Sequence, residues 1–278
     1  MTSWTKKYSP RTLAEIAGQP SAVLAIRQLV QNFSAARKKA LLLFGPPGVG
    51  KTCLVQALAE EFNYELVEMN ASQFRDANSV QTILGPATKQ ASLFGTKKII
   101  LVDDADSISG QQDRGGPAAI AEIIEGTKFP IILTATDAYN EKLKSIRQVV
   151  TLVELKPIEQ KAIEMRLKNI CTLEKINCDE IAIKKLAAFA DGDLRAAIND
   201  LQMLSEGKQE IKADDIELFG REKESELFDV LKLVFNAKST EQVFDAFDHL
   251  DLDLKDFLLW LEDGVTKEYS YLEEFAFA

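Results

Sequence analysis

The stretch Leu41–Phe62, LLLFGPPGVGKTCLVQALAEEF, decides the fold of this chain. Its first four residues form an apolar run with the length of a buried parallel strand. The residues from Val49 onward have the spacing of a helix with one apolar face. Glycines and prolines stand between the two. The sequence therefore predicts a strand, a glycine-rich loop and a helix in succession.

The loop fits the P-loop pattern G-x-x-x-x-G-K-[ST], whose backbone N–H groups surround phosphate oxygens. The helix that follows adds its positive N-terminal end. Lys51 is expected to reach the β and γ phosphates of a nucleotide, and Thr52 to bind Mg²⁺. The residues predicted to contact the nucleotide here are Gly45, Pro46, Pro47, Gly48, Val49, Gly50, Lys51, Thr52 and Cys53.

Strands and helices alternate as far as residue 156. Further strands are predicted at 64–70, 97–103, 129–136 and 149–155, and helices at 78–90 and 117–125. This alternation predicts an α/β fold with a parallel, doubly wound sheet flanked by helices. Ligands of such sheets bind at the carboxyl ends of the strands. We therefore expect a nucleotide-binding domain at 1–156.

From Pro157 onward the apolar period is helical throughout. Helices are predicted at 158–176, 179–190, 193–204, 222–236, 240–250 and 254–264. Asp179 and Asp193 stand at positions typical of N-caps. We expect a helical domain at 157–219 and, after a polar hinge near Gly220, a further helical domain at 220–278.

Acidic residues follow the predicted strand at 97–103. Its apolar run ends in Asp103, which is expected to lie beside Lys51 and to hold Mg²⁺ through water, and Asp104 is expected to orient an attacking water. Asp106 is expected to cap the following turn or to bind a neighbour. At the end of the next strand, Thr136 is expected to lie level with the γ-phosphate. The alternative for Thr136 is a threonine that begins a turn.

Composition excludes several classes of protein. The 278 residues are 46% hydrophobic and 27% charged, and neither a run of about 20 apolar residues nor a signal peptide is present. We expect a cytoplasmic, nucleoid-associated protein, or a nuclear one, with no membrane partner. Cys53, Cys171 and Cys178 lack metal-ligand spacing and are expected to be buried thiols. His249 is expected at the surface.

The charge is unevenly distributed along the chain. Residues 1–60 carry eight Lys/Arg against two Glu, whereas residues 200–278 carry eight Lys/Arg against twenty-one Asp/Glu. The net charge of −10 argues against indiscriminate nucleic-acid binding. Any nucleic-acid contact is therefore expected in the first domain. The alternative is that both regions are solvated faces.

Together these features resemble the AAA+ ATPases, and among them the replication factor C family of clamp loaders. The resemblance lies in Trp4-Thr-Lys-Lys-Tyr8-Ser-Pro10 and Ile16-Ala-Gly-Gln19, and four stretches resemble the archaeal large-subunit branch: 70–72, 92–95, 113–116 and 130–135. It implies an AAA+ ATPase domain, a helical lid at 157–219 and a partial helical collar. It also implies that Trp4, Tyr8 and Pro10 contact the adenine and that Arg195 binds the β and γ phosphates. The residues alone favour a solvated charge for Arg195.

The resemblance implies an ATP-driven loader that places the sliding clamp, PCNA, on primer-template DNA. Such loaders work as spiral pentamers with small subunits, in which an arginine from the next protomer completes each ATP site. Small subunits carry that arginine as Ser-Arg-Cys, whereas this chain reads Ser145-Ile-Arg147-Gln. We therefore expect this chain to receive an arginine finger and not to donate one.

Four departures from the family pattern change these expectations. Asp104 stands where Glu is usual, Thr136 where Asn is more frequent, and Gln73 where Asp is usual, so nucleotide binding is expected with slow or absent hydrolysis. Family members continue through a complete collar and a basic tail. A fragment, a split gene product or a collar completed from elsewhere is therefore expected. The alternatives are a nucleotide-binding scaffold of the same complex and another DNA-acting AAA+ ATPase.

Candidate contacts with DNA and clamp complete the expectations. Arg75, Lys89, Arg114 and the N-terminal basic residues are candidates for phosphate contacts, which position DNA without reading its sequence. Residues around Leu93 and Phe94 are the hypothesis for clamp contact, with the segment 275–277 as a weaker one. The alternative is that both groups pack within their own domains.

Overall fold

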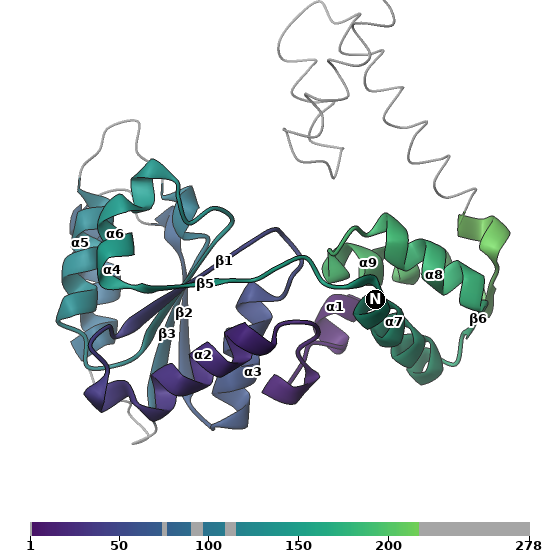
Figure 1. Ribbon diagram of the computed structural model, residues 1–278, viewed down its shortest axis with the longest axis horizontal. Helices are drawn as coiled ribbons and strands as arrows, with labels where there is room; N and C mark the ends of the chain where they lie inside the picture. The colour runs from purple at the N-terminus through teal and green to yellow at the C-terminus, as the bar shows by residue number, and fades with distance from the viewer. Residues whose placement is uncertain (1, 74–76, 90–96, 109–114, 217–278) are drawn as a thin grey trace, which may run out of the picture. The chain divides into compact units, whose positions relative to one another are not determined.

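The computed structural model describes residues 2–73, 77–89, 97–108 and 115–216 (Figure 1). The predictions for Arg75, Leu93, Phe94, Arg114 and everything after residue 216, including the partial collar and His249, lie outside these residues. Backbone contacts divide the chain into two compact units, Met1–Lys212 and Ala213–Ala278. The fold and the site below belong to the first unit, and the predicted domain boundaries at 156 and 219 stay predictions.

A five-stranded parallel sheet forms the centre of the first part of this unit, as predicted. Its strands are β1 (Ala40–Phe44), β2 (Glu65–Asn70), β3 (Lys98–Asp103), β4 (Ile131–Ala135) and β5 (Thr151–Glu154). Their order is β2-β3-β4-β1-β5, and every pairing is parallel. The strand β4 therefore separates the P-loop strand from the strand that ends in Asp103.

Helices cover both faces of the sheet (Figure 1). One face carries α2 (Pro20–Gln31) and α3 (Lys51–Glu61), and the other carries α4 (Ala77–Lys89), α5 (Gly116–Glu125) and α6 (Lys144–Val149). Leu42 and Leu133 pack in the core under α4, α5 and α6. Their neighbours Leu43 and Ile132 point to the opposite face and are also buried. Burial on both faces explains the continuous apolar runs.

A group of helices follows β5, where the helical lid is expected, and it is called the lid below. It consists of α7 (Gln160–Glu174), α8 (Glu180–Phe189), α9 (Leu194–Ser205) and a short parallel pair, β6 (Asn177–Cys178) with β7 (Glu210–Ile211). The predicted N-caps are confirmed, because Asp179 accepts a hydrogen bond from the Ile181 N–H and Asp193 accepts one from the Ala196 N–H. The β6–β7 pair and α2 were not predicted from the sequence.

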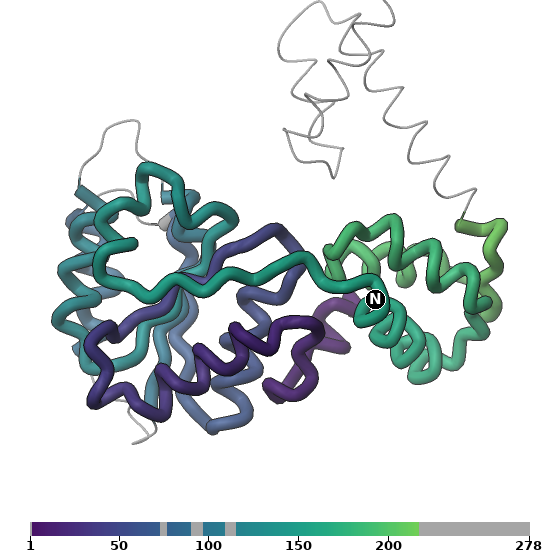
Figure 2. Tube along the Cα trace, in the orientation of Figure 1, coloured from purple at the N-terminus to yellow at the C-terminus, as the bar shows by residue number. Residues whose placement is uncertain are grey.

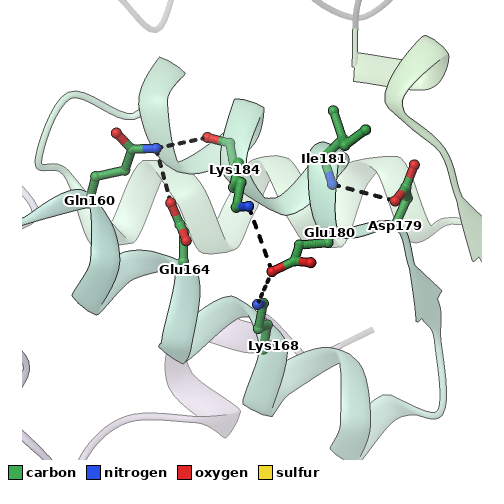
Figure 3. Close-up of polar contacts among 7 residues, drawn as sticks. All are labelled: Gln160, Glu164, Lys168, Asp179, Glu180, Ile181 and Lys184. Carbon is green, nitrogen blue, oxygen red and sulfur yellow. Dashed lines mark hydrogen bonds and ion pairs between the residues drawn. The ribbon is translucent and has the colours of Figure 1, made fainter.

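Polar contacts join α7 to α8 (Figure 3). Lys168 Nζ lies 3.1 Å from Glu180 Oε1, and Lys184 Nζ lies 3.7 Å from the same oxygen. Gln160 Nε2 donates to Glu164 Oε1 at 3.0 Å and to the Lys184 carbonyl at 3.3 Å. These pairs are exposed, so each adds little free energy to the packing of the two helices.

The predicted helices within the described residues differ from the structure by one or two residues at their ends, and two of them show why. The helix predicted from Val49 begins at Lys51, because Gly48 and Gly50 adopt left-handed backbone angles. The helix predicted at 158–176 ends at Glu174, because Lys175 has a φ of 59°. Such residues are typical of helix ends. The strand predicted at 149–155 begins at Thr151, because Val149 is the last residue of α6.

The short helix α1 (Trp4–Lys7) contacts lid helix α9, although the two are far apart in sequence (Figure 2). Among the described residues, no helix combines the length and the apolarity that crossing a membrane requires. All three cysteines are free thiols: Cys171 is buried, as predicted, and Cys53 and Cys178 are half-buried.

Candidate nucleotide-binding site

The predicted P-loop connects β1 to the N-terminus of α3. Lys51 is the first residue of α3, and its Nζ donates hydrogen bonds to the carbonyl oxygens of Gly45, at 2.6 Å, and Pro46, at 2.8 Å. Burial lowers the pKa of Lys51, while the charges of Asp106 and Asp104 act to raise it. The ammonium group is therefore held against the loop within reach of several carboxylates.

Thr52 and Asp103, the two residues predicted to bind Mg²⁺, lie together. Thr52 Oγ1 donates to Asp103 Oδ1 at 3.0 Å and lies 3.2 Å from Oδ2. A hydroxyl and a carboxylate provide oxygen ligands, which Mg²⁺ prefers, and the ion usually keeps several waters and phosphate oxygens besides. The residues present therefore fit Mg²⁺.

Thr134 is a site residue whose contact was not predicted. It is fully buried in β4, between the P-loop strand and β3. Its Oγ1 donates to Asp103 Oδ1 at 2.5 Å and accepts a hydrogen bond from the Asp104 N–H at 3.0 Å. Thr134 thus orients both acidic residues. The signal in the sequence was a polar residue inside the apolar run IILTA.

Asp104 has left-handed backbone angles, φ 54° and ψ 50°, which are uncommon for a residue other than glycine. Although the residue is largely exposed, withdrawal of its carboxyl group from water raises the pKa of Asp104, and the charges of Asp103 and Asp106 raise it further. Its carboxylate therefore stands in a strongly acidic cluster.

Asp106 binds a neighbour, which was one of its two predicted roles. Its Oδ2 accepts hydrogen bonds from the N–H groups of Thr136, at 2.7 Å, and Asp137, at 3.4 Å. The loop after β4 is therefore tied to the loop after β3. Thr136 is exposed at this edge of the sheet, and its role at the γ-phosphate stays a prediction.

Arg147 fixes the next part of the same loop. One of its guanidinium nitrogens, Nη1, donates to the carbonyl oxygens of Ala138 and Asn140, both at 2.8 Å. The guanidinium carbon lies 5.9 Å from the centroid of the Tyr139 ring. Arg147 therefore stabilises the loop after β4. That it does not act as an arginine finger for a neighbouring subunit stays a prediction.

A pocket of about 110 Å³ lies beside the P-loop. Its walls come from three parts of the chain: the N-terminal segment, defined as residues 4–17, the P-loop with α3, and the lid. The lining residues include Thr5, Tyr8, Pro10, Gly48, Val49, Gly50, Cys53, Ile158, Arg166, Leu194, Arg195 and Ile198. Burial raises the pKa of the Cys53 thiol. The predicted residues Tyr8, Pro10 and Arg195 are therefore brought to one place with the P-loop.

Trp4 has a different position from the other residues predicted to contact adenine. Its indole packs edge-on against the Tyr8 ring, with ring centroids 6.3 Å apart and an interplanar angle of 81°. Its backbone N–H donates to Gln202 Oε1 of α9 at 2.7 Å. In this structure Trp4 supports Tyr8 and the lid, and direct contact of Trp4 with a base stays a prediction.

The lid holds the N-terminal segment in place. Lys7 Nζ and the Tyr8 hydroxyl both donate to Glu174 Oε1 at 2.7 Å, and Arg166 Nη2 donates to the Tyr8 carbonyl at 2.5 Å. The hydrogen bonds from Lys7 and Tyr8 lower the pKa of Glu174, whereas burial and the hydrogen bond to Glu174 raise the pKa of Tyr8. Sequence patterns gave no signal for Arg166 or Glu174.

The lid also reaches the P-loop directly. A Cβ placed on Gly48 would lie 1.6 Å from Asp193 Oδ1, so the Asp193 carboxylate is against the loop backbone. Two residues later Arg195 is exposed, and its charge adds to burial in lowering the pKa of Lys51. The first turn of α9 thus places a positive side chain beside the phosphate-binding loop.

Comparisons with known proteins identify the fold and the family of this chain. The model of the ATPase family associated with various cellular activities (AAA) matches residues 41–153. The motor protein for Holliday junction branch migration of Thermotoga maritima, RuvB, has a TM-score of 0.62 at 18% identity, over 82% of this chain and 79% of its own. That likeness concerns the fold alone.

Closer relatives carry the name replication factor C large subunit. The one from Nanoarchaeum equitans is 40% identical over 96% of this chain and 63% of its own length. The one from Pyrobaculum aerophilum is 36% identical over 97% of this chain and 69% of its own length. The chain spans about two thirds of the length of these relatives. From this similarity, together with the P-loop, the acidic strand end and the lid, we conclude that the chain belongs to the replication factor C large-subunit family of AAA ATPases.

Proposed function

We propose that this chain is the ATP-binding large subunit of a clamp loader, which acts with small subunits to open PCNA and load it onto primer-template DNA. The observation that carries the proposal is the pocket, in which the N-terminal segment, the P-loop and the lid meet in a chain of this family. Its place of action would be the cytoplasm at the nucleoid, or the nucleus in a eukaryote.

ATP binding follows from the residues around the pocket. The phosphates would lie against the N–H groups of the P-loop and the N-terminus of α3, with Lys51 and Arg195 supplying positive charge. Tyr8 and Pro10 would pack against the base. Lys51 now donates to two loop carbonyls, so binding exchanges these hydrogen bonds for stronger ones to charged phosphate oxygens.

Hydrolysis depends on the acidic cluster. Thr52 and Asp103 would hold Mg²⁺, which neutralises negative charge on the phosphates when bound. Thr134 keeps the Asp103 carboxylate turned toward Thr52. Asp104 would orient the attacking water, with Thr136 at the γ-phosphate and an arginine from a neighbouring subunit completing the site.

A second candidate function is supported by Asp104. Its side chain is one methylene shorter than Glu, and its left-handed backbone is tolerated better by Asp than by longer side chains. A site built this way would bind ATP and hydrolyse it slowly. The chain would then be a nucleotide-binding scaffold of the same complex, while the small subunits supply most of the hydrolysis.

The proposal of DNA as a partner is supported by the excess of positive charge in the first part of the chain. The first sixty residues carry eight Lys/Arg against two Glu, and Lys89 is exposed on α4. Positive side chains of this kind contact phosphates without reading sequence. The clamp and the small subunits are proposed from the family alone.

The test is steady-state ATPase activity of the full chain mixed with small clamp-loader subunits, with and without PCNA and primed DNA. Three variants would be compared: Lys51→Ala, Asp104→Glu and, as a matched control, Lys161→Ala, which removes an exposed lysine of α7. We expect stimulation by clamp and DNA, loss of this site's share of activity in Lys51→Ala, a gain in Asp104→Glu and no change in Lys161→Ala.

The outcomes separate the candidates. Assembly and stimulation that persist unchanged in Lys51→Ala would favour the scaffold. Single-turnover hydrolysis in a complex where only this site is intact would exclude the scaffold. A mixture that neither assembles nor responds to PCNA would refute the clamp-loader proposal and leave a nucleotide-binding protein with another client.

A further inference from the structure

Two cysteines of the lid lie in contact outside the nucleotide pocket. Cys171, in the last turn of α7, has its Sγ 2.9 Å from the Sγ of Cys178 in β6. Cys171 is only 4% exposed, whereas Cys178 is half-buried. Both are thiols in this structure.

The backbone on each side of the pair is fixed by its own hydrogen bonds. The Ile176 N–H donates to the Cys171 carbonyl at 2.9 Å, which closes the turn between the two residues. The Asp179 N–H donates to the Ile211 carbonyl at 3.0 Å, and Cys178 pairs with Ile211 in the β6–β7 ladder. The two cysteines therefore stand on backbone segments that are hydrogen-bonded on both sides of the sulfur contact.

A second connection holds the same two elements together. Lys168, three residues before Cys171, pairs with Glu180, two residues after Cys178, at 3.1 Å (Figure 3). Asp179 follows Cys178 directly and caps α8. Contacts besides the sulfurs thus hold the elements that carry the two cysteines. A disulfide, with an S–S distance of about 2.05 Å, would require the two sulfur atoms, now 2.9 Å apart, to approach by about 0.9 Å.

We propose that Cys171 and Cys178 form a dithiol site that reacts with small-molecule disulfides, such as oxidised glutathione, and closes to an intramolecular disulfide. The half-buried Cys178 is the residue that a reagent reaches first. The hydrogen bond donated by the Cys171 thiol lowers the pKa of Cys178, and the same contact raises the pKa of Cys171. Cys178 therefore acts as the attacking thiolate and Cys171 as the resolving thiol.

The reaction is two successive thiol–disulfide exchanges. In the first, the Cys178 thiolate attacks one sulfur of R–S–S–R, an S–S bond forms to Cys178, and RS⁻ leaves and takes up the proton that Cys178 lost. In the second, Cys171 loses its proton and attacks Cys178 Sγ, so that the Cys171–Cys178 bond forms and the second RS⁻ leaves as RSH. The chain loses two electrons and two protons, and the reagent becomes two thiols.

The test equilibrates the full chain with a series of ratios of reduced to oxidised glutathione, followed by acid quenching, thiol counting and intact-mass measurement. Three thiols per chain are expected in the reduced form, because the sequence holds three cysteines, and one in the oxidised form. The oxidised chain should be lighter by about 2 Da and carry no glutathione.

Variants identify the pair. Cys53→Ser should still lose two thiols, whereas Cys171→Ser and Cys178→Ser should each keep both remaining thiols or gain a glutathione adduct. Cys171→Ala provides a second form in case a serine hydroxyl is not accepted in the buried position. Three thiols that persist in oxidised glutathione alone, a stable adduct on Cys178 in the native chain, or pairing that involves Cys53 would each overturn the proposal.

Discussion

Replacing Gly48 with alanine tests how the lid meets the P-loop. Gly48 and Gly50 both have left-handed φ angles, 66° and 95°, so alanine is strained at either position by about 1–2 kcal/mol. The surroundings differ. A Cβ at Gly50 meets nothing within 4 Å, whereas one at Gly48 would lie 1.6 Å from Asp193 Oδ1 and 2.1 Å from its Cγ.

The loss of stability expected in Gly48→Ala depends on the hydrogen bond that Asp193 would lose. Its carboxylate accepts a hydrogen bond from the Ala196 N–H at 2.8 Å and caps α9. Moving the carboxylate out of the way breaks this cap, which is worth about 1 kcal/mol. We therefore expect Gly48→Ala to lower the free energy of unfolding by about 2–3 kcal/mol and Gly50→Ala by about 1–2 kcal/mol.

The assay is urea unfolding followed by far-UV circular dichroism, on the two single variants, Asp193→Ala and both double variants. Asp193→Ala removes the obstacle together with the cap. The Gly48→Ala/Asp193→Ala pair should therefore be less destabilised than the sum of its parts by about 1 kcal/mol, and the Gly50→Ala/Asp193→Ala pair should be additive. Equal coupling in the two pairs, or none in either, would refute the contact between Asp193 and the loop.

Three further predictions follow from contacts in and around the site. Arg147→Ala should lower stability by about 2–3 kcal/mol, because two loop carbonyls lose a charged donor. The ATPase activity of the assembled complex should stay nearly intact, and its collapse, with the fold retained, would identify a finger. Asp104→Asn should raise the urea midpoint at neutral pH, because a raised pKa means that the folded state disfavours the charged form. This gain should fade as the pH falls below about 3.9, where the aspartate is protonated in both states, and a gain independent of pH would contradict the assignment. Glu174→Gln should weaken nucleotide binding several-fold, because it loosens the N-terminal segment. Glu180→Gln removes a similar partner of a lysine away from the pocket and should leave the affinity unchanged. Fluorescence titration with an ATP analogue measures both affinities, and equal values would contradict the role of the segment.

Local features of the site were predictable from sequence because they depend on short-range pattern. The P-loop motif, the strand ending in Asp103, and the caps Asp179 and Asp193 each follow from residue types at fixed spacing. The parallel sheet follows from alternation of strands and helices. The sheet and the two caps are confirmed, with small shifts at helix ends. The nucleotide and metal roles of the P-loop, Thr52 and Asp103 stay predictions.

Long-range contacts were not predictable from one sequence. The place of β4 between β1 and β3 brings Thr134 beside Asp103, yet no period in the sequence fixes strand order. The bonds of Glu174 to the N-terminal segment join residues more than 160 positions apart. A charged residue that has a partner, such as Glu174, cannot be distinguished in the sequence from one that is solvated, because the partner is set by the tertiary structure.

Because three parts of the chain form the pocket, a bound nucleotide would also oppose local opening of the structure. In the free chain we expect the lid to open without unfolding of the sheet, because local contacts join them: hydrogen bonds of the N-terminal segment, the contact of Asp193 with the P-loop, and the connection after β5. A nucleotide that touches all three walls must leave before any one of them moves away. At a hundred times its dissociation constant it would suppress such opening by about 2.7 kcal/mol. The Trp4 amide proton, which opening would release from Gln202 Oε1 of α9, should then exchange with solvent about a hundredfold more slowly.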